Sequence, residues 1–78
     1  MEELLKILIE PLVSDIKKIK IERVNEENNN IRFIVSVPKK DIAKVIGKEG
    51  KMVKSIKNLL KVRAIKENVF ANLELLEV

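Results

Sequence analysis

The sequence predicts an α+β fold in which helices cover one face of a three-stranded sheet. Three observations carry this prediction. An amphipathic segment opens the chain, two alternating segments follow around a polar loop, and two further helical segments precede a last alternating one. The predicted order is therefore helix, strand, strand, helix, helix, strand. At 78 residues the chain is expected to form one domain with a small core, since only about 60% of the unfolded surface is buried at this size.

The first helix is predicted from apolar residues that recur at intervals of three and four. Pro11 interrupts the pattern, because its missing N–H removes the bond to the carbonyl of Ile7. We therefore expect a helix over roughly residues 2–13 and leave its continuation to Lys18 open. The stripe consists of Leu4, Leu5, Leu8, Ile9, Leu12, Val13 and Ile16.

Two strands are predicted on either side of a polar loop. Residues 19–24 alternate as a half-buried strand does, and residues 25–30 are rich in asparagine, which tolerates left-handed backbone. Pro38 ends the second strand, because proline cannot donate to the ladder. The inward face of the second strand is expected to hold Ile31, Phe33, Val35 and Val37.

The second half of the chain is predicted to contain two helices and a strand. Asp41 stands where it can cap or charge the start of a short helix. A longer helix begins after residue 50, and residues 69–78 alternate as the third strand. The longer helix carries an apolar stripe of Met52, Val53, Ile56, Leu59, Leu60 and Ala64. The last strand is expected to face inward with Val69, Ala71, Leu73 and Leu75.

Between these two helices lies the sequence VIGKEGK, residues 45–51. We call residues 47–50 the glycine turn. Gly47 and Gly50 can adopt positive φ and allow another backbone to approach closely. The first turn of the following helix adds unsatisfied N–H groups, which attract anions. A turn whose glycines only cap and pack is the structural alternative, but the neighbouring lysines favour a phosphate-binding role.

The charge is unevenly distributed. Residues 39–66 contain ten basic and two acidic residues, a formal charge of +8, whereas the rest has six basic and ten acidic residues, or −4. A basic half beside an acidic half indicates a polyanionic partner, although a merely solvated surface is the alternative. On the longer helix, the lysines that cluster opposite the apolar stripe are Lys51, Lys54, Lys57 and Lys61.

The composition argues against an enzyme. Cysteine and histidine are absent, which removes thiol chemistry, the commonest general base and the commonest metal ligands, so no metal or cofactor is implied. A Walker A loop fails because Met52 follows Gly50-Lys51, and position 45 is not glycine. The start lacks the basic flank of a signal peptide, and no apolar run approaches the roughly 18 residues of a membrane span. We therefore expect a cytoplasmic protein.

The glycine turn and its surroundings resemble a known family. VIGKEGK is similar to the G-x-x-G loop of KH domains, which clamps the backbone of about four nucleotides. The predicted element order resembles the type II KH arrangement over nearly the whole chain. The chain looks most like small bacterial proteins made of one free-standing KH domain, the KhpA-type RNA-binding proteins. One segment departs from the resemblance: residues 14–18 replace the short proline-containing turn that relatives often have, which concerns the end of the first helix.

The resemblance also implies a function. KhpA-type proteins are regarded as RNA chaperones that act with a larger Jag-type KH protein, in RNA regulation linked to cell-wall homeostasis and cell length. The implied partners are single-stranded RNA and a second KH protein, either another copy in a homodimer or the larger Jag-type protein. Neither a membrane nor a small-molecule substrate is implied.

The expected RNA site combines the glycine turn with its neighbours. Gly47, Lys48, Glu49 and Gly50 match the family's loop, and the apolar helix before it is expected to floor a groove for bases. The full predicted site is Ile42, Lys44, Val45, Ile46, Gly47, Lys48, Glu49, Gly50, Lys51 and Lys54. Two other functions stay open at this point: a helix-turn-helix protein that binds double-stranded DNA, and an assembly module without nucleic-acid binding.

Overall fold

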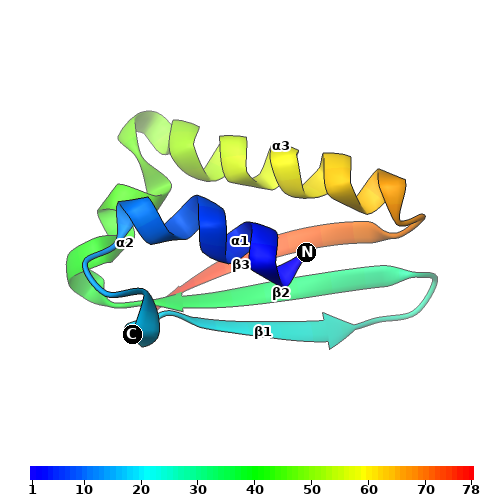
Figure 1. The fold of residues 1–78 in the computed structure, drawn as a ribbon, viewed down its shortest axis with the longest axis horizontal. Helices are drawn as coiled ribbons and strands as arrows, with labels where there is room; N and C mark the ends of the chain where they lie inside the picture. The colour runs from blue at the N-terminus through cyan, green and yellow to red at the C-terminus, as the bar shows by residue number, and fades with distance from the viewer.

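Three strands form one sheet, and three α-helices cover one of its faces (Figure 1). The computed structural model describes residues 1–78. The α-helices are α1 (Glu2–Ile9), α2 (Lys39–Ile46) and α3 (Lys51–Lys66), and the strands are β1 (Lys20–Asn25), β2 (Asn30–Val37) and β3 (Phe70–Glu77). This order confirms the predicted α+β fold of a type II KH domain. None of the helices has the length and apolar character needed to cross a membrane.

Strand β2 lies in the centre of the sheet. It pairs antiparallel with β1, where Lys20 lies opposite Ser36, and parallel with β3, where Asn30 lies opposite Phe70. Its inward side chains alternate as predicted, and Phe33 is fully buried. Strand β3 is an edge strand, so one row of its backbone N–H and C=O groups has no partner strand.

The core lies between the sheet and the helices. Thirteen of the 78 residues are buried, which agrees with the small core expected from the chain length. Only part of the apolar stripe predicted for α3 is buried in the core, because Met52 and Leu59 are 38% and 48% exposed. The twelve apolar core residues are Leu5, Ile9, Ile31, Phe33, Val35, Val37, Val45, Ile56, Leu60, Ala64, Ala71 and Leu73.

The first helix ends earlier than the sequence predicts. Helix α1 stops at Ile9 and is followed by a 3₁₀ turn, Glu10–Leu12, which contains Pro11. The possible continuation to Lys18 is wrong, because Val13 is extended and a separate 3₁₀ turn covers Ile16–Lys18. A side-chain cap begins this second turn: the backbone N–H of Lys17 donates to Oδ1 of Asp15 at 3.0 Å.

Asp41 does not cap α2 with its side chain, as the sequence had suggested. It lies in the first turn of α2 but is only 2% exposed, and its Oδ2 accepts from the backbone N–H of Ser14 at 3.3 Å and from the Ser14 hydroxyl at 3.0 Å. A buried carboxylate requires such partners. The pair therefore ties the segment after α1 to the start of α2, the helix that leads into the glycine turn.

Candidate nucleic-acid interface

The glycine turn separates α2 from α3, and three of its four residues have positive φ. Helix α2 ends as the N–H of Gly47 donates to the carbonyl of Ala43 at 2.9 Å, and the N–H of Gly50 donates to the carbonyl of Gly47 at 3.2 Å. Gly47, Glu49 and Gly50 have φ values of +76°, +58° and +73°. This conformation costs a non-glycine residue about 1–2 kcal/mol, so glycine is favoured at two of the three positions. Helix α3 begins directly afterwards at Lys51.

The two glycines are needed for different reasons. A Cβ atom on Gly47 would lie 2.5 Å from Cβ of Met52 and 2.9 Å from its backbone nitrogen, so there is no space for a side chain. A Cβ atom on Gly50 would meet nothing within 4 Å. Gly47 is thus required by the packing of the turn against α3. Gly50 leaves open space in which another molecule can approach the backbone.

Four lysines surround the turn, and all are exposed: Lys44, Lys48, Lys51 and Lys54. The only ion pair among them joins Lys51 Nζ to Glu49 Oε2 at 3.9 Å, between side chains that are 79% and 68% exposed. An exposed pair of this kind contributes little free energy, so a phosphate can replace the carboxylate. The start of α3 adds backbone N–H groups to the same positive region.

The apolar residues before the turn do not share one role. Ile46 is 38% exposed beside Gly47, and Ile42 is half-buried. Val45, however, is fully buried in the core and presents no surface to a ligand. The predicted apolar wall for bases is therefore reduced to Ile42 and Ile46, because α2 turns Val45 toward the sheet.

A cleft between α3 and the edge strand β3 extends the site beyond the predicted residues. We call it the α3–β3 cleft; its volume is about 150 Å³. The cleft lies along one face of α3. This face begins at Gly50 and carries Lys54, Lys57 and Lys61, since residues three and four apart lie on the same side of a helix. Only the lysine spacing on α3 hinted at this cleft in the sequence. The cleft is lined by Lys57, Leu60, Lys61, Ala71, Asn72 and Leu73.

Comparisons with known proteins show the family of the chain. The family model described as "KhpA/KhpB, KH domain" matches residues 2–75. The RNA-binding protein KhpA of Chlamydia pneumoniae is 39% identical over 77 residues, which cover 99% of this chain and 97% of that protein. KhpA of Clostridium perfringens is 37% identical over 68 residues, covering 87% and 89%. KhpA of Listeria monocytogenes is 32% identical over 77 residues, covering 99% and 100%.

Proposed function

Because the chain belongs to the KhpA/KhpB family of KH domains, we propose that it binds single-stranded RNA through the glycine turn and the α3–β3 cleft. One observation carries the proposal. The turn has no room for a side chain at Gly47 and has open space at Gly50, so its backbone lies bare between two helices. In KH domains a loop of this kind clamps the backbone of about four nucleotides.

The parts of the site have separate tasks in this proposal. The glycine turn accepts the sugar-phosphate backbone. Lys48, helped by Lys44, Lys51 and Lys54, neutralises its phosphates. Ile42 and Ile46 give apolar contact to bases near the turn. The edge of β3 offers backbone donors and acceptors to base edges in the α3–β3 cleft.

This division favours unpaired strands. A narrow cleft beside a helix holds single bases, and a base can enter only after it leaves its stack and its pairing partner. Binding therefore stabilises unpaired RNA relative to a duplex, and this differential affinity is the physical basis of RNA-chaperone activity. A helix-turn-helix function would require the reverse preference, for duplex DNA.

The test is a set of parallel salt titrations with single-stranded RNA, single-stranded DNA and duplex DNA. We expect the tightest binding to single-stranded RNA and the weakest to the duplex. Tighter binding to duplex DNA would support the helix-turn-helix alternative. If the protein bound none of the three at low salt, the result would support the alternative of an assembly module without nucleic-acid binding.

The lysines on α3 are expected to act as individual phosphate contacts. Changing Lys54 or Lys57 to alanine should weaken binding of all single-stranded sequences about equally. Each change should also flatten the dependence of log affinity on log salt by about 0.7, the contribution of one contact on a single strand. Lys18→Ala, which removes another exposed lysine from the 3₁₀ turn before β1, is the matched control. An equal effect of Lys18→Ala would indicate a diffuse electrostatic surface.

We propose in addition that the protein works as an assembly of KH domains. Exposed apolar side chains lie together on the helix layer, including Ile7 at 69% and Val62 at 56%. Acidic residues at the start of α1 and basic residues at the end of α3 flank them, so a second copy offers charges of both signs, as self-complementary interfaces require. We call this the α1–α3 patch: Leu4, Ile7, Leu59 and Val62.

Joining two RNA sites would raise avidity by roughly 10²–10⁴ without new kinds of contact. The occupant we propose is a second copy of this chain, and a larger Jag-type KH protein with the same surface is the alternative that the family resemblance implies. The cellular role would then be RNA regulation linked to cell-wall homeostasis.

Sedimentation at micromolar concentration should reveal a dimer. Val62→Glu should give a monomer, because it places a charge in the α1–α3 patch. Leu76→Glu is the matched control: Leu76 is 48% exposed, but it lies on the uncovered face of the sheet, so that variant should stay dimeric. A parent protein that is monomeric throughout this range, and that binds RNA no more weakly than a tethered pair, would show that self-assembly is unnecessary.

A further inference from the structure

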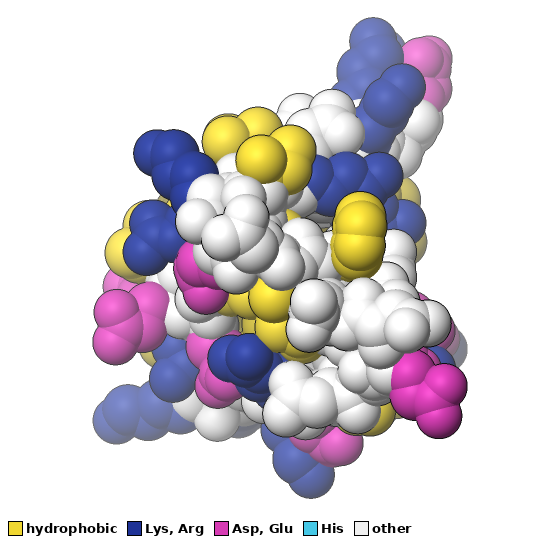
Figure 2. Space-filling view, turned by 90° about the vertical axis from the view of Figure 1, so that its right-hand side faces the viewer, with side chains coloured by type: hydrophobic (Ala, Val, Ile, Leu, Met, Phe, Trp, Pro, Cys, Tyr) yellow, Lys and Arg dark blue, Asp and Glu magenta, His cyan; other side chains and the backbone are white.

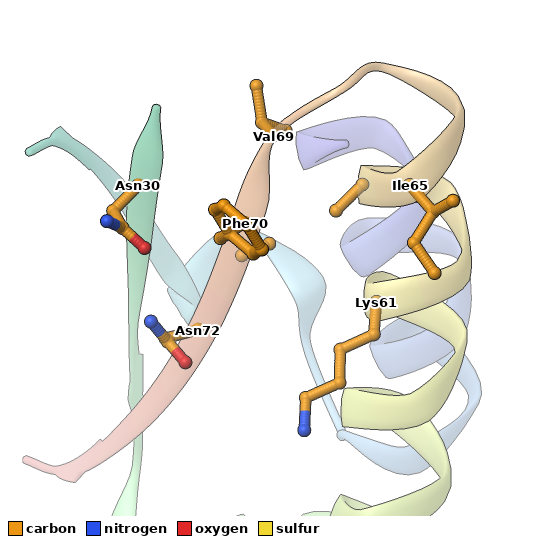
Figure 3. Close-up of a pocket in the computed structure, with 8 residues that line it drawn as sticks. Asn30, Lys61, Ile65, Val69, Phe70 and Asn72 are labelled. Atoms are coloured by element: carbon orange, nitrogen blue, oxygen red, sulfur yellow. The ribbon is translucent and has the colours of Figure 1, made fainter. Parts of the chain in front are cut away.

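A second hollow lies beyond the α3–β3 cleft, at the end of α3 that is remote from the glycine turn. Its volume is about 360 Å³, and we call it the distal hollow. Phe70 forms its centre, and Figure 3 shows this ring between Asn30 and Asn72 on one side and the α3 residues Lys61 and Ile65 on the other. The distal hollow shares Lys61, Ala71 and Asn72 with the α3–β3 cleft, so the two adjoin each other.

Phe70 is an unusual residue in this chain. The only other aromatic residue, Phe33, is fully buried, whereas Phe70 is 67% exposed. Its position is nevertheless fixed, because its backbone N–H donates to the carbonyl of Asn29 at 2.9 Å and it pairs with Asn30 across the sheet. The fold therefore fixes the backbone of Phe70 and leaves its aromatic ring uncovered.

The groups around the ring suit a nucleobase. Aromatic rings stack on bases of any sequence. The amide nitrogen of Asn30 donates to the carbonyl of Glu27 at 2.9 Å, which leaves its Oδ1 as an acceptor, and the exposed amide of Asn72 supplies both donors and an acceptor. Figure 2 looks onto this end of the molecule and shows a broad uncharged surface, with Lys and Arg side chains above it and both basic and acidic side chains along its other margins. An uncharged surface of this kind suits an uncharged base, and the lysines attract the phosphate that follows that base in the strand.

We propose that the distal hollow binds one further nucleobase of the same RNA strand, stacked on Phe70 and hydrogen-bonded by the amides of Asn30 and Asn72. The proposal rests on the proposed function, because the strand must already occupy the glycine turn and the α3–β3 cleft. It makes Phe70 a stacking residue and the two asparagines determinants of base preference at one end of the bound strand.

The first experiment is a double-mutant cycle between protein and RNA. Affinities of the parent and Phe70→Ala are measured for an eight-nucleotide RNA and for a series in which one base at a time is absent. We expect Phe70→Ala to weaken binding of the intact RNA at least about fivefold, since stacking is worth roughly 1–3 kcal/mol per base. At one position near an end of the bound strand, removal of the base should abolish this difference. Leu76→Ala, an exposed apolar truncation on the same strand and face, should leave the affinity unchanged.

The second experiment uses the absence of tryptophan from the chain. Phe70→Trp introduces a single indole, whose fluorescence should fall when the intact RNA binds and should stay unchanged when the RNA lacks the critical base. RNA binding that depends on the glycine turn but is indifferent to Phe70→Ala at every position would overturn the inference and leave the proposed function intact. The inference would also be overturned if Phe70→Ala weakened RNA binding by the same factor whichever base was removed, because the ring would then contact no base. Absence of RNA binding by the parent would remove both proposals.

Discussion

Replacing Lys48 and Glu49 with two aspartates is expected to weaken RNA binding at least roughly tenfold, or about 1.4 kcal/mol. The two residues occupy the middle of the glycine turn, and both are exposed, so the change reverses the charge at position 48 and makes the pair doubly negative without touching the core. Both glycines remain, and with them the backbone of the turn. The loss is therefore expected in binding, measured by fluorescence anisotropy with labelled RNA, and not in helix content.

The chain offers a matched control for this variant. Lys20 and Glu22 are also exposed, with Nζ and Oε1 3.3 Å apart, and they lie on β1 away from the turn. Changing both to aspartate alters the net charge by the same amount. If the glycine turn is the site, this control should retain nearly all of the affinity. Unchanged affinity of the Lys48 and Glu49 variant, with an intact fold, would remove the turn from the site.

Alanine at the two glycines is expected to produce different defects. Gly47→Ala should lower the free energy of unfolding by about 2–4 kcal/mol, because positive φ and the overlap with Met52 both oppose a Cβ atom. Gly50→Ala should cost only about 1–2 kcal/mol, since positive φ alone opposes it. Urea denaturation of the two variants measures this difference.

RNA binding should separate the same two variants in another way. The methyl group of Gly50→Ala would enter the open space in which the proposed RNA backbone lies, so folded Gly50→Ala protein should bind RNA more weakly than the parent. Equal losses of stability at both positions would contradict the packing role assigned to Gly47. Undiminished RNA binding by Gly50→Ala would argue that this space is not used by the ligand.

Much of the fold could be predicted because its patterns are local. The alternation in β2 and the stripe of α1 report directly which side of each element faces the core. The position of the glycine turn could be predicted because two closely spaced glycines interrupt the apolar periodicity between two helical segments. Proline at position 11 also marked the end of the first helix, although the helix stops two residues before it.

Contacts between distant segments could not be predicted. Asp41 was expected to cap or charge the start of its own helix. It does lie in the first turn of α2, but its carboxylate accepts hydrogen bonds from Ser14, 27 residues away in the chain. Val45 and Ile46 are equally apolar neighbours, and only the packing of α2 on the sheet decides that Val45 is buried and Ile46 is exposed.

By itself, then, the sequence determined the type II KH order of elements, the inward face of the central strand and the position of the glycine turn, because each depends on spacing within a few residues. Tertiary structure alone decided that β3 becomes an edge strand beside α3. That placement creates the α3–β3 cleft, brings Lys57 and Lys61 to its wall and leaves Phe70 exposed at its far end. The physical reason is that β3 pairs with β2, about forty residues earlier in the chain, and no local pattern encodes which side of the sheet a returning strand joins.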